Sequence, residues 1–112
     1  MNFFKIEGRK IGGGYPTYFI ADIAANHDGD LEKAKDLIYS CAEAGAHAAK
    51  FQNFKAHSIV SDHGFKSLQG KLSHQAAWKK SVYEVYQEAE LPMEWTETLK
   101  ETCKKAGVHY FT

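Results

Sequence analysis

The stretch YFIADIAANHDGDLEKAKDLIYSCAEAGAHAAKFQNF, residues 18–54, decides the fold class. Residues 18–25 are apolar except for Asp22, which predicts a buried strand. A turn follows and ends in Asp30, a good helix N-cap, and apolar residues then recur at helical spacing up to Gly45. Residues 46–54 are again short, largely apolar and strand-like. The pattern predicts a strand–helix–strand unit of a parallel α/β sheet.

The segments on either side extend this alternation. Residues 1–16 read as two short strands around a turn near Glu7, followed by a glycine-rich linker. Residues 56–73 show no sustained period and predict a loop, whereas residues 73–90 predict a helix. A second helix should run to Gly107, and a further strand should open directly after it.

The length of the chain bounds the architecture. A (β/α)8 TIM barrel needs roughly 250 residues, and the sequence has 112. We therefore expect an α/β chain that is the N-terminal portion of a (β/α)8 TIM barrel preceded by a short β-hairpin. Residues 1–16 would form the hairpin and its loop, and residues 17–112 the first βα units of an incomplete barrel domain.

Composition excludes several classes of partner. Fourteen Lys and Arg balance fourteen Asp and Glu, so a strongly basic nucleic-acid surface is not expected. No apolar run approaches the ~20 residues of a membrane helix. Cys41 and Cys103 form no C-x-x-C pair, which favours a reduced, cytoplasmic setting. The six histidines show no helical H-x-x-x-H pair, so the spacing predicts no metal site.

Candidate chemistry lies where the predicted strands end, because ligands of parallel α/β folds gather there. Asp22 and Lys50 each interrupt an apolar strand, and a charge in such a place is costly unless it is paired or used. Both are candidate catalytic residues. Gln52 shares the strand face of Lys50 by alternation, so both side chains could reach one ligand. The alternative for Asp22 and Lys50 is a purely structural ion bridge.

Three further residues sit at strand exits. Asn26 and His27 follow the first strand in a turn, where side chains are free to contact a substrate or else only shape the turn. Thr112 follows the last predicted strand. Together with Lys50 and Gln52, these three are the candidate substrate-binding residues.

Two segments together resemble a known family: IADIAANHDGD at residues 20–30 and AEAGAHAAKFQNFKA at residues 42–56. LPMEWT at 91–96 and KKAGVHYFT at 104–112 fit the same pattern. The sequence resembles the N-terminal barrel segment of the sialic acid (N-acetylneuraminate) synthases. The most specific parts of the resemblance are the Asn-His-x-Gly turn and the Lys-Phe-Gln segment.

The resemblance implies a barrel enzyme that condenses phosphoenolpyruvate with an N-acetylated hexosamine and releases phosphate. It matches Lys50 to a lysine that holds the phosphate, Gln52 to a sugar-contacting glutamine, and Asn26 and His27 to a turn beside the substrate. Thr112 falls at or next to a hydroxyl-bearing pair that contacts phosphate.

The same resemblance implies partners and one cofactor. A divalent metal, Mn²⁺ or Mg²⁺, would have its ligands outside this chain, and the full-length parent would be a homodimer. The 112 residues alone would be inactive. The sequence departs from the family in having Asp22 where a glutamate is usual and Ala24 where a glycine is usual, which leaves the identity of the sugar open.

Two rival functions remain open from the residues. Lys50 could serve a barrel aldolase or lyase as a Schiff-base amine, since a lysine in a dry strand can have a depressed pKa. Alternatively, the chain could be a small non-catalytic α/β interaction module in which Asp22 and Lys50 form only an internal bridge.

Overall fold

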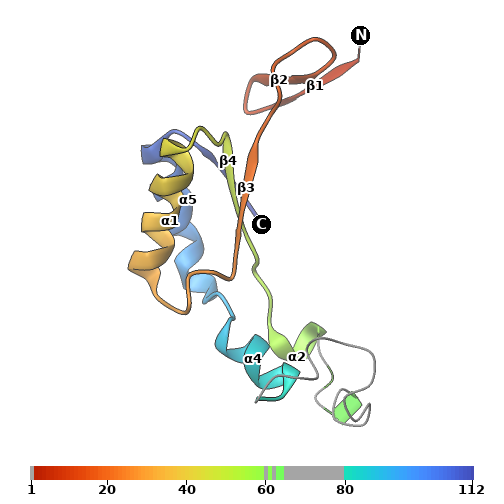
Figure 1. Cartoon of the computed structure of the whole chain (residues 1–112), viewed down its shortest axis with the longest axis vertical. Helices are drawn as coiled ribbons and strands as arrows, with labels where there is room; N and C mark the ends of the chain where they lie inside the picture. Colours follow the sequence, from red (N-terminus) through yellow and green to blue (C-terminus); the bar gives the residue numbers. More distant parts are fainter. Residues whose placement is uncertain (1, 60, 62, 65–79) are drawn as a thin grey trace.

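A computed structural model describes residues 2–59, 61, 63–64 and 80–112. Their order is a β-hairpin, a parallel strand–helix–strand unit, two short helices, a longer helix and a last strand (Figure 1). The hairpin extends from one end of a central sheet, and α2 (Ala56–Ile59) and α4 (Val82–Glu88) lie beyond the other end. We call α2 and α4 the arm helices. The predicted α/β class is confirmed.

The central sheet has the order β3-β4-β5 and is parallel throughout. Its strands are β3 (Ile20–Ala24), β4 (Ala48–Phe51) and β5 (His109–Phe111). Separately, β1 (Phe3–Ile6) and β2 (Arg9–Gly12) pair as an antiparallel hairpin. Its turn uses positive φ angles at Glu7 and Gly8, so the predicted hairpin is confirmed.

Two helices cover one face of the sheet. Asp30 is the N-cap of helix α1 (Leu31–Glu43), as predicted, and its carboxylate accepts hydrogen bonds from the backbone N–H groups of Glu32 and Lys33. The 3-10 turn η2 (Met93–Trp95) leads into α5 (Thr96–Ala106), which ends at Gly107 with φ +80°. The core between helices and sheet comprises Ile23, Ala34, Ile38, Ala49, Phe51, Leu91, Leu99, Cys103 and Val108.

The opposite face of the sheet carries the charged residues. Lys50 alternates with Ala49 and Phe51, which are both fully buried in the core, so its side chain emerges on the face that α1 and α5 do not cover. Asp22, its register partner, is exposed. The prediction that the strand at 18–25 is buried is therefore wrong for one of its two faces, because among the described residues helices cover only the other face.

The segment after β4 also differs from expectation. Residues 56–73 were predicted as a loop, but Ala56–Ile59 forms α2. A four-residue helix is too short to show an apolar period, which explains the error. Of the helix predicted over 73–90, the described part is helical only at Val82–Glu88, where Ser81 is the N-cap. Residues 65–79 lie outside the described residues. In the part of the chain that is described, no helix is both long and apolar enough to cross a bilayer.

Candidate functional site

Asp22 and Lys50 stand side by side at the exits of adjacent strands. They are register partners in the β3–β4 ladder, and parallel partners point to the same face of a sheet. Asp22 is exposed and Lys50 is half-buried. Among the described residues, no ion pair within 4.0 Å includes either side chain. The structural bridge that the sequence left open is therefore not formed, and both charges are available to a ligand.

A bulge in β3 separates Asp22 from the residues that follow. Asp22 pairs with Lys50, but Ala24 pairs with Phe51, so three residues of β3 oppose two of β4. A regular ladder would pair Ala24 with Gln52, and the bulge pairs it with Phe51 instead. Ala24 adopts φ +53°, in the left-handed region where a glycine is unstrained. Ala24 is the position at which the resembled family usually has glycine.

A cavity of about 620 Å³ opens at the exits of β4 and β5. Three predicted site residues line it together: Lys50, Gln52 and Thr112. Its far wall comes from the arm helices and includes Ile59 and Val85. The volume is in the range of small-molecule sites, which combine an apolar lining with a few polar groups. The cation of Lys50, the amide of Gln52 and the hydroxyl of Thr112 therefore line one cavity in which a single small molecule would fit.

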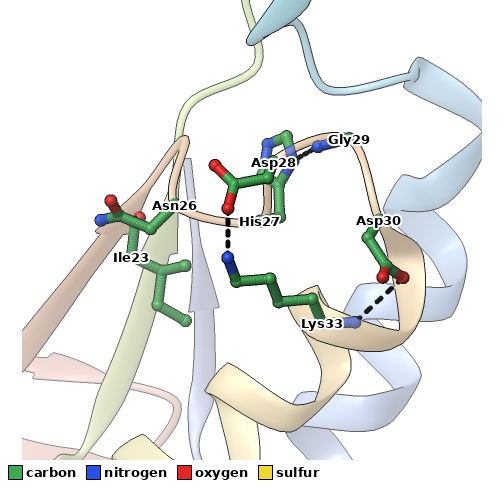
Figure 2. Close-up of polar contacts among 7 residues, drawn as sticks. All are labelled: Ile23, Asn26, His27, Asp28, Gly29, Asp30 and Lys33. Atoms are coloured by element: carbon green, nitrogen blue, oxygen red, sulfur yellow. Dashed lines mark hydrogen bonds and ion pairs between the residues drawn. The ribbon is translucent and has the colours of Figure 1, made fainter.

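Asn26 belongs to the turn between β3 and α1 and is exposed. Its side-chain Nδ2 donates to the carbonyl of Ile23 at 2.9 Å, and its backbone N donates to the same oxygen at 3.1 Å (Figure 2). One side of the amide thus shapes the turn. Its carbonyl oxygen remains available to a ligand at the mouth of β3.

His27 lies under this turn with a fully buried side chain. Its Nδ1 accepts a hydrogen bond from the backbone N of Gly29 at 3.0 Å (Figure 2). Its ring meets the ring of Trp95 edge to face, with the ring centroids 5.5 Å apart. The His27 side chain is therefore not free in the turn, and its hydrogen bond to Gly29 fits the other role that the sequence left open, that of shaping the turn. A sequence cannot show this, because the ring is buried by Trp95, which lies far along the chain on η2.

The hydrogen bond at Nδ1 fixes the protonation of His27. Since Nδ1 accepts, the proton of the neutral ring sits on Nε2, which is buried and has no hydrogen-bond partner among the described residues. Burial lowers the pKa of His27, although the neighbouring Asp28 carboxylate acts in the opposite direction. Asp28 itself is exposed and pairs with Lys33 (Figure 2). His27 is thus a neutral donor ring locked inside the fold.

Asn53 is a site residue that the sequence interpretation missed. It lines the cavity beside Gln52 and forms hydrogen bonds to residues of β5, the β5 exit and α5. Its position directly after Lys-Phe-Gln was visible in the sequence, but the partners that give it a role lie more than forty residues away.

The described residues do not supply a metal centre. Nowhere in ranges 2–59 and 80–112 do three His, Cys, Asp or Glu side chains gather as a ligand set. The acidic and imidazole groups near the strand exits, Asp22 and His27, are respectively isolated and buried.

Comparisons with known proteins all point to one family. The sequence profile of the NeuB family matches residues 37–112. The chain is 34% identical to the spore coat polysaccharide biosynthesis protein SpsE of Bacillus subtilis, over 100% of this chain and 29% of that protein. It is 37% identical to the N,N'-diacetyllegionaminic acid synthase of Legionella pneumophila, over 96% of this chain and 30% of the synthase.

A solved structure shows the same fold. The crystal structure of an N-acetylneuraminic acid (sialic acid) synthetase from Leptospira borgpetersenii, in complex with citrate, superposes with a TM-score of 0.77 at 26% identity. The alignment covers 98% of this chain and 33% of the synthetase. The chain thus spans about three tenths of the length of the curated relatives it matches.

Proposed function

The chain belongs to the NeuB family, and we propose that it forms the N-terminal portion of a (β/α)8 TIM barrel that condenses phosphoenolpyruvate with an N-acetylated hexosamine. The product would be a nonulosonic acid of the N-acetylneuraminate type, with phosphate released. One observation carries the proposal: Asp22 and Lys50 lie in register at the exits of adjacent parallel strands, and neither has an ion-pair partner among the described residues. Relatives named as synthases of legionaminic and N-acetylneuraminic acids support the reaction class.

Lys50 would hold the phosphate of phosphoenolpyruvate. Lys50 is half-buried and lines the cavity, and a cation that is partly shielded from water binds a dianion more strongly than a fully exposed one. Gln52 and Asn26 would contact the sugar through their amide groups. The apolar wall of the arm helices, including Ile59 and Val85, suits the methyl group of an N-acetyl substituent.

Asp22 would act on the carbon that becomes cationic. In the proposed reaction, the methylene carbon of phosphoenolpyruvate forms a bond to the aldehyde carbon, which leaves positive charge on the phosphate-bearing carbon. Water then adds to that carbon, and phosphate departs from it. A carboxylate beside this centre stabilises the cation and orients the water, as general acid–base groups do for roughly 10²–10⁴ in rate.

His27 would act on the substrate through the turn rather than by direct contact, because its side chain is buried. A divalent Mn²⁺ or Mg²⁺ ion held outside the described residues would polarise the aldehyde. The proposal includes a homodimer and a cytoplasmic location, the latter supported by two unpaired cysteines.

The deciding experiment measures phosphate release from phosphoenolpyruvate by the full-length enzyme with a panel of N-acetylated hexosamines. Lys50→Met should lower kcat/KM for phosphoenolpyruvate by at least ~100-fold, since a charge-assisted contact contributes roughly 3 kcal/mol. Lys100→Met is the matched control, because Lys100 is an exposed lysine of α5 whose ammonium group pairs with Glu97 on the same helix.

Two results would contradict the proposal. Unchanged kinetics in Lys50→Met would remove the phosphate-binding role. Borohydride trapping of a keto acid on Lys50 would instead establish the Schiff-base lyase, since the condensation needs no imine.

A further inference from the structure

The side chain of Asn53 joins three elements at the mouth of the sheet. Its Oδ1 accepts hydrogen bonds from the hydroxyl of Thr112 at 2.6 Å and from that of Tyr110 at 3.2 Å. Its Nδ2 donates to Thr96 Oγ1 at 3.2 Å and contacts the sulfur of Met93 at 3.9 Å. These partners lie on β5, its exit, η2 and α5, whereas Asn53 itself follows β4.

These contacts use the whole hydrogen-bonding capacity of the Asn53 amide. A primary amide has two N–H donors and two carbonyl lone pairs, and each of the four meets one of these protein atoms. Burial raises the pKa of Tyr110, so its phenol stays protonated and remains a donor to Asn53. Although Asn53 lines the cavity, its polar atoms are already engaged, and it can influence a ligand only through its neighbours.

Thr112 is held by Asn53 at two points. The backbone N of Asn53 donates to Thr112 Oγ1 at 3.2 Å, while the Thr112 hydroxyl donates to Asn53 Oδ1. The single hydroxyl proton and one of the two lone pairs are therefore used, which fixes the rotation of the hydroxyl. Two hydrogen bonds thus connect Thr112, which directly follows β5, to Asn53, which follows β4.

We propose that Asn53 is a positioning residue that holds the Thr112 hydroxyl at the cavity edge and fixes the exit of β5 relative to the exit of β4. The inference rests on the proposed function, since β4 presents Lys50 and Gln52 to the same cavity. Catalytic groups must be placed to better than about 1 Å, because an error of that size can cost on the order of 100-fold in rate. Asn53 supplies the cross-strand tie that sets this spacing.

The test is a double-mutant cycle in the full-length enzyme, read as kcat/KM for phosphoenolpyruvate. Asn53→Ala should lower kcat/KM by about 10- to 100-fold. In the Thr112→Val background, the same Asn53→Ala change should lower it by less than about 3-fold, because the hydroxyl that it positions is already gone. Losses that simply multiply would overturn the proposal.

Thr102→Val is the control for general destabilisation. It removes a hydrogen bond of a buried hydroxyl, from Thr102 Oγ1 to the carbonyl of Thr98 at 2.8 Å, within α5 and outside the cavity lining. It should lower the melting temperature and leave kcat/KM within about 3-fold of the wild type. A loss of activity equal to that of Asn53→Ala would show that Asn53 matters only for stability.

A second readout separates this inference from the proposed function. If the wild-type enzyme consumes no phosphoenolpyruvate with any hexosamine, the proposed function fails. Amide hydrogen exchange then tests whether Thr112 and Asn53 hold each other. The backbone N–H of Asn53 should exchange at least about 10-fold faster in Thr112→Val than in the wild type, whereas Thr102→Val should leave its exchange rate unchanged. Equal exchange in all three proteins would overturn the positioning role of Asn53 as well.

Discussion

His27 provides the sharpest test of whether the Asn-His-x-Gly turn is a brace or a substrate contact. The perturbation is His27→Asn, compared with His27→Ala. The side-chain carbonyl of asparagine can replace Nδ1 as the acceptor for Gly29 N–H, whereas alanine cannot. Both variants remove the ring that packs against Trp95.

The magnitudes follow from two contacts. Loss of the fully buried ring leaves a space beside Trp95, which costs about 2–3 kcal/mol by comparison with other large-to-small changes. Loss of the acceptor for Gly29 N–H adds about 1 kcal/mol, because that amide is partly exposed and water can replace the partner. His27→Ala should therefore lower the free energy of unfolding by about 3–4 kcal/mol, and His27→Asn by about 1 kcal/mol less.

The pH dependence of the stability difference between the wild type and His27→Asn reports on the buried imidazole alone. Burial holds the pKa of His27 below its ordinary 6.5, so the unfolded chain binds a proton that the folded chain resists. The stability that wild-type His27 contributes is thus complete above about pH 6.5 and falls as the pH drops below it, by at most about 1.4 kcal/mol per pH unit. His27→Asn has no such group, so the stability gap between the two proteins should narrow on acidification.

The assay is urea denaturation of the full-length protein followed by tryptophan fluorescence at pH 7.5 and pH 5.5, with steady-state kinetics alongside. If His27 is a brace, activity per folded molecule stays within a few-fold of the wild type. An unchanged free energy of unfolding in His27→Asn, together with a KM raised 10-fold or more, would refute the reasoning.

Three other changes test separate parts of the site. Asp22→Asn should lower turnover about 100-fold in the phosphate-release assay with the melting temperature intact, because Asp22 is exposed and forms no ion pair with another described residue. A large fall in melting temperature with activity retained would identify a structural role instead. Ala24→Gly should raise the free energy of unfolding, measured by urea denaturation, by about 0.5 kcal/mol, because relief of the backbone strain at φ +53° exceeds the entropy that glycine loses on folding. A lower free energy of unfolding in this variant would show that the bulge is unstrained. Glu90→Ala should lower the free energy of unfolding by about 1–3 kcal/mol, because Glu90 Oε1 accepts a hydrogen bond from the backbone N–H of Ala56 at 2.7 Å. The control is Glu88→Ala at an exposed position, which should change the free energy of unfolding by less than about 0.5 kcal/mol.

The regular part of the fold was predictable because it depends on local patterns. The Asp30 cap, the helix that ends before Gly45 and the helix that ends at Gly107 are each set by residues within a few positions of one another. The juxtaposition of Asp22 and Lys50 also followed, since parallel strands align their exits. These features need only sequence periodicity and the rules of the βαβ unit.

The features that were missed depend on contacts between distant residues. His27 is buried by Trp95, and Asn53 gains its partners from η2, α5 and β5. The β3 bulge shifts the pairing register, which the sequence pattern alone would continue without interruption. None of these is encoded in a local period, so each needed the fold before it could be seen.

The way the arm helices join the sheet has a consequence for how such a protein can diversify. The chain leaves the sheet at Lys55 and Ala56 and returns at Glu90, whose carboxylate binds the backbone N of Ala56 at 2.7 Å and approaches Lys55 Nζ at 3.7 Å. The point where the chain leaves the sheet is thus bound directly to the point where it returns, through contacts that involve none of the residues between them. Because doubling the length of a closed loop costs only about 0.6 kcal/mol, this insert can be lengthened, shortened or exchanged between relatives while the sheet keeps its shape. One wall of the cavity could then change its shape in evolution, or in the hands of a protein engineer, while Lys50 and Gln52 stay where they are.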